Sequence, residues 1–381
     1  MNVIVIGLGA MGSAAAQQLA ERGCHVRGFD LFAPPHTHGS SHGLTRIFRQ
    51  AYFEDHRYVP LLIRSFDLWQ KLEADSGERL LHLPGTLVIG PRNGQLVGKS
   101  AASAVQFALP HELLDAKELK RRYPVFDIKQ NTHGLLERNA GYLLAEKCVE
   151  QQLRLAARSG AELHTTEPVL DWHAEKHGSS VSVRTAKETY SADHLVVTAG
   201  PWAPHVLAKL ELPLHTTRQV VFWFSPTESL DHFREHRLPV YLFEAEADDE
   251  LTLYGFPLTG SDAEGIKVAL HGSKELCTPG TICRDIRPSD EQAIRKRIAK
   301  TIPSLTGRML RAQTCLYTMT PDEHFLLGTL PDNPTVTIAA GFSGHGFKFA
   351  PVIGEIMADL VFRGSTEWAL DLFSLTRFRK I

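Results

Sequence analysis

The glycine-rich motif near the N-terminus constrains this chain more than any other feature. Residues 3–6 form a short β-branched apolar run that is typical of a buried strand, and a G-x-G-x-x-G motif follows at residues 7–12. In such a motif Gly7 permits a tight turn, Gly9 lets the backbone approach a pyrophosphate, and Gly12 lets the following helix pack closely on the strand. The order of strand, glycine turn and helix therefore predicts a dinucleotide-binding unit.

Asp30 extends this prediction. It ends a second apolar run, predicted as a strand at residues 25–29, and follows Gly7 by a little more than 20 residues. An acid at about this spacing hydrogen-bonds the ribose of a dinucleotide. The motif does not distinguish FAD from NAD, and an ordinary glycine-rich strand–helix turn is the alternative interpretation.

Length and charge limit the classes of function. A chain of 381 residues favours two domains, because a single hydrophobic core seldom grows so large. The formal net charge is −2 and no long Lys/Arg block is present, so we expect no nucleic-acid partner. No apolar run reaches the roughly 18 residues of a membrane span, and the N-terminus resembles a core strand rather than a signal peptide. We therefore expect a cytoplasmic protein without a membrane partner.

The cysteines and histidines give little sign of a disulfide framework or a metal site. The five cysteines are odd in number and widely scattered. His36, His38 and His42 gather in one loop, but no carboxylate or cysteine cluster accompanies them, so we expect no metal there. Ser40 and Ser41 belong to the same loop, which follows a strand end, and they are candidate phosphate or ribose contacts.

Alternation of two kinds of segment predicts an interleaved architecture. Segments of the dinucleotide type occur at residues 1–80, 145–215 and 315–381, and the last of these contains a second glycine-rich turn. Residues 81–144 and 216–314 are expected to form the substrate domain, the second segment largely as antiparallel strands. The predicted fold class is mixed α/β, with a Rossmann-like cofactor domain interleaved with a β-sheet-rich substrate domain.

Local patterns add predictions of single elements. Apolar spacing predicts helices at Glu112–Arg122 and Ser289–Ile302, the second with Ser289 as its N-cap. Arg46 and Arg49 are three residues apart, so on a helical turn they would share a face. Two adjacent cations favour a bound carboxylate, although a solvated basic turn is the alternative.

Four stretches of the chain together resemble the monomeric sarcosine oxidase family, which includes N-methyltryptophan oxidase and pipecolate oxidase. They are GSSHGLTRIFR at residues 39–49, YGFP at residues 254–257, CLYTMTPDEHF at residues 315–325 and AGFSGHGFK at residues 340–348. The resemblance runs nearly end to end. It implies an FAD-dependent oxidase of N-methyl or cyclic secondary α-amino acids that returns electrons to O₂ as H₂O₂. It also implies a monomer whose partners are a secondary amino acid and O₂.

The resemblance implies which residues hold the cofactor. Cys315 matches the cysteine that forms a thioether with the 8α-carbon of the flavin, so the FAD is expected to be covalent. From composition alone, Cys315 would be a buried structural thiol. The other expected cofactor contacts are Gly7, Gly9, Gly12, Asp30, Ser40, Ser41, Gly341, Gly344, Gly346 and Lys348.

The resemblance also implies roles for basic residues. Arg49 and Lys348 match two cations that hold the substrate carboxylate. Arg46 and Lys267 match a basic pair at the flavin face, where positive charge favours reduced flavin and developing superoxide. His271 matches a histidine near the substrate amine, and on a strand it would point to the same side as Lys267.

Two tyrosines complete the implied site. Tyr254 and Tyr317 match residues that border the substrate pocket, although both could be core aromatics with a satisfied hydroxyl. Lys348 could likewise be a solvated surface lysine. The expected catalytic residues are Arg46, Lys267, His271, Tyr317 and Lys348, and the expected substrate contacts are Arg49, Tyr254 and Lys348.

Departures from the family pattern leave the substrate open. Leu44 stands where relatives often carry an aspartate, whose hydrogen bonds it cannot reproduce. The loop at residues 257–265 looks longer than in sarcosine oxidases and is expected to line the substrate entrance, with Asp262 and Glu264 adding negative charge. Two other functions are compatible with the sequence: a flavin dehydrogenase that uses an acceptor other than O₂, and a non-catalytic flavin-binding subunit or sensor.

Overall fold

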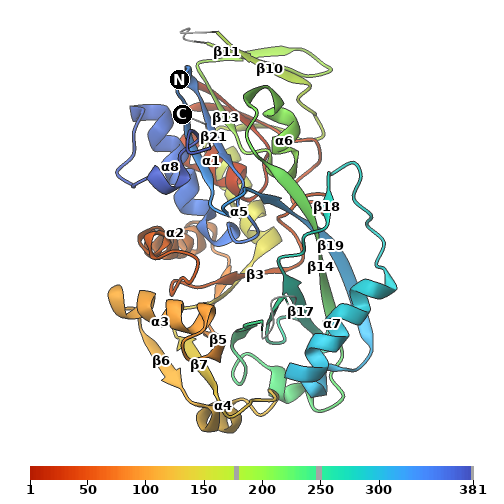
Figure 1. Cartoon of the computed structure of the whole chain (residues 1–381). Helices are drawn as coiled ribbons and strands as arrows, with labels where there is room; N and C mark the ends of the chain where they lie inside the picture. Colours follow the sequence, from red (N-terminus) through yellow and green to blue (C-terminus); the bar gives the residue numbers. More distant parts are fainter. Residues whose placement is uncertain (176–179, 246–250, 379–381) are drawn as a thin grey trace.

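The structure is a computed structural model, and it describes residues 1–175, 180–245 and 251–378. The molecule is elongated, with one large sheet and its helices towards one end and a second large sheet towards the other (Figure 1). The N- and C-terminal ends of the chain lie close together at the first end (Figure 1). This arrangement agrees with the predicted mixed α/β class.

The first sheet carries the N-terminal strand. Its described strands are, in spatial order, β20, β21, β13, β1, β2 and β9. They span Leu326–Leu330, Asn333–Ala340, His194–Val197, Asn2–Ile6, His25–Phe29 and Glu162–His164. β1 pairs in parallel with β2 and β13, whereas β20 runs antiparallel to β21. β1 is buried from Val3 to Ile6, as expected for a parallel strand that is covered on both faces.

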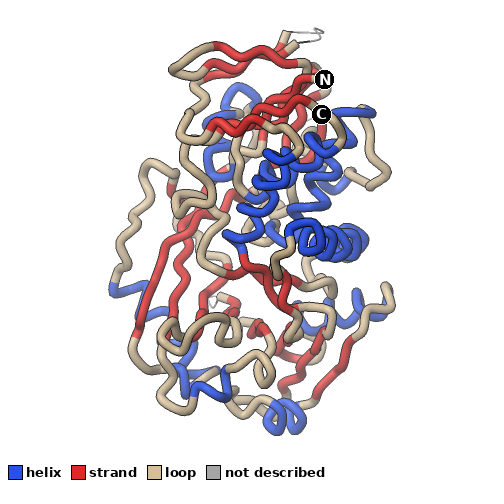
Figure 2. Tube along the Cα trace, turned by 180° about the vertical axis from the view of Figure 1, so that it is seen from behind, coloured by secondary structure: helices blue, strands red, loops and turns tan. Residues whose placement is uncertain are grey.

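Helices cover this sheet. α1 (Ala10–Glu21) contacts both α5 (Ala145–Arg158) and α8 (Ala350–Arg363), and α8 also contacts α2 (Val59–Ser76). A Cβ at Gly354 would lie only 2.6 Å from the backbone of Ala14, so glycine allows α8 to approach α1 closely. Figure 2 shows these helices gathered beside the first sheet, while the other half of the molecule is mostly strands and loops.

The second large sheet is built from the middle of the chain. Its described strands follow the order β18, β14, β17, β16, β15, β5, β7 and β6, and β19 pairs with the other edge of β14. They span Leu276–Cys277, His215–Phe224, Ile266–His271, Thr252–Gly255, Val240–Phe243, Thr86–Pro91, Thr132–Glu137, His111–Leu114 and Met309–Met319. The pairing is antiparallel as predicted, except that β15 and β5 run parallel.

Smaller elements complete the described fold. One small sheet has the order β3-β8-β4, with bounds Thr45–Phe48, Gly141–Leu144 and Leu81–His82, and another joins β10, β11 and β12 at Asp171–Ala174, Val181–Arg184 and Thr189–Ala192. The remaining helices are α3 (Gln95–Gln106), α4 (Ala116–Arg122), α6 (Ala203–Val206) and α7 (Pro288–Thr301). Short 3-10 turns lie at His56–Tyr58, Gly200–Trp202, Ala208–Leu210, Leu230–Phe233, Pro303–Leu305, Phe347–Phe349 and Asp371–Phe373.

Two predicted helices differ from the observed elements. The helix predicted at Glu112–Arg122 is β6 followed by α4, because Asp115 breaks the segment and caps α4 by accepting a hydrogen bond from the Glu118 amide. Ser289 is not the N-cap of α7. That helix begins at Pro288, and the carboxylate of Asp290 accepts a hydrogen bond from the amide of Arg287 instead.

Most strands of each large sheet lie within the residue ranges of one predicted domain. The strands of the first sheet lie within residues 1–80, 145–215 and 315–381, and most of those of the second lie within 81–144 and 216–314. β19 crosses the predicted boundary between residues 314 and 315. The division into domains stays a prediction.

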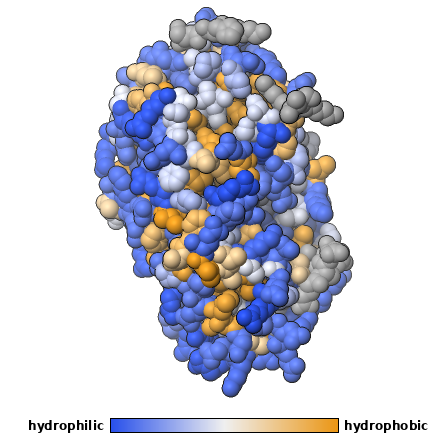
Figure 3. All heavy atoms as spheres, turned by 60° about the vertical axis from the view of Figure 1, so that its left-hand side comes forward, coloured by the Kyte–Doolittle hydropathy of each residue, from blue (hydrophilic) through white to orange (hydrophobic). Residues whose placement is uncertain are grey.

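The outer surface is mainly hydrophilic on the face shown in Figure 3, where apolar residues gather in a band near its middle. Among the residues that the structure describes, no helix combines the length and apolar content that crossing a membrane requires.

Gly12→Ala should destabilise the protein by about 3 kcal/mol, the upper end of the usual range for overpacking, because the contact is with rigid backbone. A Cβ at residue 12 would overlap the carbonyl oxygen of Gly7, which is backbone and cannot turn aside. Gly23→Ala is the matched control. Gly23 has a φ of +86° but nothing within 4 Å of its Cβ position, so it should cost only about 1 kcal/mol. Urea unfolding of both variants tests the difference, and equal losses would contradict it.

Candidate active site

A cavity of about 330 Å³ connects the first sheet to the second. Its lining begins near Asp30 and Trp202, passes the glycine turn and Cys315, and reaches Lys348 and His271. A long cavity with apolar walls and a few polar groups is typical of a cofactor and substrate site.

The N-terminus of α1 opens into one end of this cavity. Gly9, Ala10 and Met11 all line it, and the first turn of the helix carries no acidic side chain. The amide of Ala10 donates to Ser41 Oγ (3.1 Å), which fixes the serine loop beside the helix. A helix N-terminus without an acid in its first turn attracts anions, so this end suits a pyrophosphate.

Asp30 stands at the end of β2 and lines the same region. Its Oδ2 accepts a hydrogen bond from the amide of Leu8 (2.8 Å), and its Oδ1 accepts one from the amide of Phe32 (3.0 Å). His36 Nε2 lies 3.4 Å from Asp30 Oδ1. The carboxylate is therefore fixed between the glycine turn and the following loop.

The loop histidines have other partners than a metal. The rings of His36 and His38 contact Phe32, and His42 is buried with Nε2 3.1 Å from the carbonyl oxygen of Gly39. Burial lowers the pKa of His42 to about 3, with a further lowering by the charge of Arg46. Within the described part of the chain, no group of three or more His, Cys, Asp or Glu side chains could hold a metal ion.

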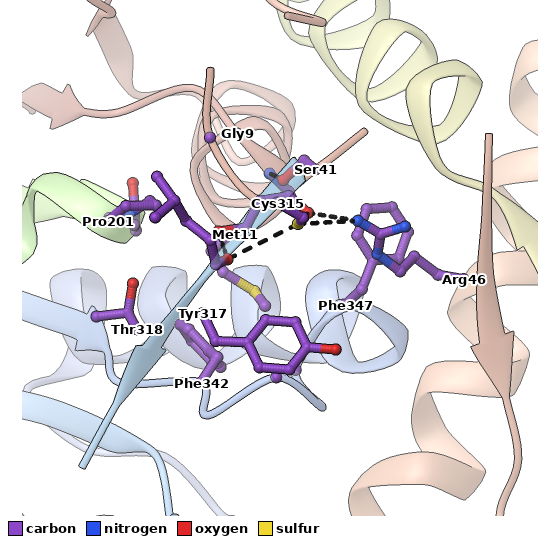
Figure 4. Close-up of a pocket in the computed structure, with 18 of the residues that line it drawn as sticks. Gly9, Met11, Ser41, Arg46, Pro201, Cys315, Tyr317, Thr318, Phe342 and Phe347 are labelled. Carbon is purple, nitrogen blue, oxygen red and sulfur yellow. Dashed lines mark hydrogen bonds between the residues drawn. The ribbon is translucent and has the colours of Figure 1, made fainter. Parts of the chain in front are cut away.

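β19 brings Cys315 and Tyr317 to the cavity. They are two residues apart, so on a strand they point to the same side. The Cys315 Sγ lies 3.8 Å from the Arg46 guanidinium and 3.8 Å from the carbonyl oxygen of Ser40. Figure 4 shows the Cys315 sulfur joined to Arg46 by a dashed line, with Tyr317 on the same strand. A cation and a carbonyl oxygen therefore flank the sulfur in the cavity.

The segment that carries both arginines is a strand and not a helical turn. Arg46 lies within β3, and Arg49 follows its end. The predicted shared helical face is therefore wrong. Arg46 donates to the carbonyl oxygens of Ser40 (2.7 Å) and Thr45 (2.8 Å), whereas Arg49 turns to a different part of the cavity.

Leu44 precedes β3 in a left-handed conformation, with a φ of +70°. Its amide and that of Gly43 donate to the carboxylate of Glu146 at the start of α5 (2.7–3.1 Å). The side chain of Leu44 packs on the apolar cluster of Val221 and Trp223. A glutamate from another segment therefore fixes the backbone at this turn, and the leucine fills an apolar space.

Lys267 lies on β17 as predicted, but its ammonium does not line the cavity. Its Nζ donates to the carbonyl oxygens of Gly43 (2.6 Å) and Thr45 (2.8 Å) and to the Thr45 hydroxyl (3.1 Å). Burial lowers its pKa well below the ordinary lysine value, and the nearby charge of Arg46 lowers it further. The role of Lys267 at the flavin face stays a prediction.

Arg49 is buried, with a 3% exposed side chain, and forms an ion pair that sequence reasoning missed. Its Nη2 lies 2.6 Å from both carboxylate oxygens of Glu54, and its Nη1 donates to the carbonyl oxygen of Ala51 (3.2 Å). The rings of Tyr52 and Phe53 flank the guanidinium at 4.2 and 3.9 Å. The spacing of five residues fits neither a helix face nor a strand face, so only the bend after β3 reveals this pair.

Lys348 lies in the 3-10 turn before α8 and is 5% exposed. Its Nζ donates to the carbonyl oxygen of His345 (2.6 Å) and lies 3.4 Å from the hydroxyl of Tyr52. Burial lowers its pKa to about 7, and the charge of Arg49 lowers it further, while Glu54 opposes the shift. Lys348 and Arg49 thus line the same cavity as Glu54, whose carboxylate pairs with Arg49.

His271 and the two tyrosines border this region. His271 Nδ1 lies 3.2 Å from the hydroxyl of Tyr317, and the rings of His271 and Tyr254 are 6.4 Å apart. Burial lowers the pKa of His271 to about 4 and raises those of both tyrosines. These three side chains are therefore neutral at pH 7 and offer hydrogen bonds rather than charge.

The cavity brings most of the predicted site residues together. The predicted residues that line it are Gly7, Gly9, Asp30, Ser40, Ser41, Arg46, Arg49, Tyr254, His271, Cys315, Tyr317, Gly341, Gly344, Gly346 and Lys348. Gly12 and Lys267 do not line it; Gly12 packs against Gly7 instead. No described residue of the 257–265 loop lines it either, and the place of this loop at the substrate entrance stays a prediction. Asp262 pairs with Arg234 (3.1 Å), away from the cavity.

Comparison with known families identifies the cofactor of this protein. The family described as FAD dependent oxidoreductase matches residues 2–360. The chain belongs to this family. It is therefore an FAD-dependent oxidoreductase, and the family, the mixed α/β class and the FAD cofactor predicted from the sequence are confirmed.

Curated relatives of this flavoprotein match it over almost its whole length. It is 45% identical to "Monomeric sarcosine oxidase" of Streptomyces avermitilis, covering 99% of this chain and 97% of that protein. It is 39% identical to the protein of that name from Bacillus sp. (strain NS-129), covering 99% and 96%. It is 34% identical to "N-methyl-L-tryptophan oxidase" of Yersinia pestis, covering 99% of each chain.

Solved structures support the fold of the flavoprotein. The open form of NikD, an amino acid oxidase of nikkomycin biosynthesis, has a TM-score of 0.84 at 23% identity, covering 98% of this chain and 96% of that one. L-proline dehydrogenase from P. horikoshii also has a TM-score of 0.84 at 23% identity, with 99% and 97% coverage. At this identity the likeness concerns the fold alone.

The residues present fit FAD. A Cβ at Gly9 would meet only Ser41 Oγ, at 3.4 Å, so the backbone at the helix start is open to the cavity. Gly7, with a φ of +87°, would bring a Cβ to 2.6 Å from the carbonyl oxygen of Thr198. Asp30, the start of α1 and Cys315 all line the cavity, where they would hold the ribose, the pyrophosphate and the ring of FAD.

Proposed function

We propose that this flavoprotein oxidises N-methyl or cyclic secondary α-amino acids of the sarcosine type, using O₂ as the electron acceptor. The observation that carries the proposal is the pair of buried cations, Arg49 and Lys348, in the same cavity as Cys315. The relatives named as oxidases of sarcosine and N-methyl-L-tryptophan support the same substrate class. An N-methyl amino acid, O₂ and water would give the primary amino acid, formaldehyde and H₂O₂. A cyclic secondary amino acid and O₂ would give the cyclic imine and H₂O₂.

The chain's own residues bind and orient the substrate. Arg49 and Lys348 hold its carboxylate, and charge-assisted hydrogen bonds to both cations fix its direction as well as its affinity. His271 and Tyr317 offer neutral groups beside the amine, so the substrate amine does not meet a second cation there. Tyr254 and Phe53 close the apolar sides of the region. The bound FAD accepts the electron pair from the substrate and passes it to O₂.

We include covalent attachment of FAD through Cys315 in the proposal. The Arg46 guanidinium lies 3.8 Å from the sulfur that would form the bond. The new bond joins Cys315 Sγ to the flavin 8α-carbon and replaces one S–H and one C–H bond. The two electrons and two protons released are taken up by O₂, which leaves as H₂O₂.

Several finer points belong to the same proposal. Lys267, whose Nζ donates to the carbonyl oxygens of Gly43 and Thr45, would supply positive charge near the flavin face for O₂ reduction when it is protonated. The interleaved cofactor and substrate domains have the boundaries given above. The relatives' name, monomeric sarcosine oxidase, supports a monomer, and we propose a cytoplasmic location.

The direct test is anaerobic mixing of the purified flavoprotein with sarcosine, N-methyltryptophan and pipecolate. Loss of the yellow flavin absorbance, followed by its return with H₂O₂ on admission of air, is the expected result. Bleaching without H₂O₂ formation would favour the dehydrogenase, and no bleaching by any secondary amino acid would favour the non-catalytic flavoprotein.

Acid precipitation should leave the yellow colour in the protein pellet, because acid does not break a thioether. The variant Cys315→Ala should release its colour into the supernatant completely. Cys148→Ala is the matched control, since Cys148 is also buried but does not line the cavity. A colourless wild-type pellet would contradict the attachment while leaving FAD binding itself untouched.

A further inference from the structure

We propose that Glu137 is a positioning residue that fixes Arg49 for the substrate carboxylate. Glu137 ends β7 in the second sheet, far along the chain from Arg49, and is 2% exposed. The inference rests on the proposed function, in which Arg49 binds that carboxylate. It adds a residue that does not line the cavity and touches neither substrate nor cofactor.

The contact runs through the backbone that follows β3. Glu137 Oε1 accepts a hydrogen bond from the amide of Gln50 (2.8 Å), and its Oε2 accepts one from the amide of Ala51 (2.9 Å). The carbonyl oxygen of Ala51 in turn accepts the hydrogen bond from Arg49 Nη1 (3.2 Å). One residue, Ala51, therefore joins the Glu137 carboxylate to the guanidinium.

A neighbouring strand holds the same segment. Thr86, at the start of β5, pairs with Glu137, at the end of β7, and its hydroxyl donates to the carbonyl oxygen of Phe48 (3.3 Å). The residues on both sides of Arg49 are thus bound to the adjacent ends of β5 and β7. At the other end of the segment, Glu146 accepts the amides of Gly43 and Leu44, so two carboxylates fix the strand that carries the arginines.

The chemistry of this contact predicts what a substitution does. Burial raises the pKa of Glu137 to about 7, although the amides of Ala51 and Gln50 and the charge of Arg49 lower it. The ionised carboxylate offers two acceptor oxygens for two amides. Glutamine in its place offers one oxygen and one N–H group, which faces an amide donor and cannot bond to it. Glu137→Gln should therefore loosen the Ala51 amide and, through it, the guanidinium.

The experiment measures binding of methoxyacetate, in which an ether oxygen replaces the amine of sarcosine, by calorimetry on the holoenzyme. Glu137→Gln should raise its Kd about tenfold and raise the KM for sarcosine by a similar factor, while kcat changes less than twofold. Glu244→Gln is the matched control. Glu244 also accepts two backbone amides, those of Gln95 and Leu96, but at the start of α3 and outside the cavity lining. The Kd of methoxyacetate for Glu244→Gln should stay within twofold of the wild-type value.

A double variant separates positioning from general destabilisation. If Glu137 acts through Arg49, Glu137→Gln should have no further effect on the Kd once Arg49→Ala is present. An effect that persists in that background, or one equal to that of Glu244→Gln, would overturn the inference alone. Failure of the wild type to bind methoxyacetate would instead overturn the proposed function, and the inference with it. If Glu137→Gln does not fold, Glu137→Asp replaces it in the same measurements. Its shorter side chain should draw the carboxylate away from the two amides, and the same results would support or overturn the inference.

Discussion

Replacing Lys348 by methionine should lower kcat/KM for sarcosine about a hundredfold or more. Removing one partner from a buried, hydrogen-bonded charge pair costs about 3 kcal/mol, and 1.4 kcal/mol corresponds to a factor of ten. Methionine fills a similar volume, and it leaves the carbonyl oxygen of His345 and the hydroxyl of Tyr52 without the lysine donor. The larger share of the loss should appear in KM, because the substrate carboxylate is present in both the ground and transition states.

A substrate without a carboxylate provides the control. N-methylethanolamine carries the same secondary amine but no anion for Lys348 and Arg49 to bind. Its kcat/KM should be low with the wild type and should change less than threefold in Lys348→Met. Equal losses for sarcosine and N-methylethanolamine would show that Lys348 supports the fold of the cavity rather than binding the carboxylate. Steady-state O₂ consumption with both substrates decides between these results.

Local sequence was enough to predict the dinucleotide unit. β1, the glycine turn, α1 and β2 follow one another within 30 residues. The Cβ position of Gly7 is closed by the remote Thr198, but Gly12 has a short-range reason for its place. A Cβ at Gly12 would strike Gly7, only five residues away. Elements that depend on neighbouring residues can be predicted from the local sequence pattern. The predicted bounds of β1 and β2 differ from the observed ones by no more than a residue or two.

Long-range pairing decided the features that the sequence did not reveal. Arg46 and Arg49 have a helical spacing, yet their segment is a strand because β3 pairs with β8, about a hundred residues later. The two carboxylates that accept backbone amides on either side of β3 are equally distant in the sequence. Glu137 ends β7 and Glu146 begins α5, and only the folded backbone brings them to β3. The hydrophobic periodicity of a single segment cannot predict contacts with residues so far away in the sequence.

The resemblance to known oxidases predicted which residues line the cavity better than it predicted the atoms that they contact. Cys315, Arg46 and Tyr317 meet in the cavity as expected. Lys267 shares a strand face with His271, but its three donors are directed at the backbone and hydroxyl of the Gly43–Thr45 turn. A motif preserves which residue stands at a position, whereas the direction of a long flexible side chain depends on acceptors from other segments.

Methoxyacetate binding should weaken about tenfold for each pH unit above pH 8. Burial lowers the pKa of Lys348 to about 7, so the free protein holds this lysine neutral above that pH. Carboxylate binding favours the ammonium form, and the complex must then take up one proton, which costs about 1.4 kcal/mol per pH unit. Calorimetry between pH 8 and 9.5 measures the slope. Methoxyacetate has no amine, so any titration in this range belongs to the protein.

The neighbouring groups do not produce this slope. The pKa values of His271 and His345 are lowered by burial to about 4 and about 3, and that of Tyr52 is raised well above 10 by burial, so none of them titrates between pH 8 and 9.5. Glu54, whose pKa is held below its ordinary value by Arg49, and Glu137, with a pKa of about 7, are already ionised.

The variant Lys348→Arg isolates the cause. An arginine keeps its proton throughout this range, so the variant should bind methoxyacetate with an affinity that changes less than twofold between pH 8 and 9.5. The pKa of Lys267 is also lowered by burial, and a slope that survives in Lys348→Arg would assign the proton to Lys267. A wild-type affinity that is flat above pH 8 would mean that Lys348 stays charged without a ligand, stabilised by Glu54. The charge on Lys348 would then be a permanent feature of the cavity rather than one that the substrate's carboxylate induces.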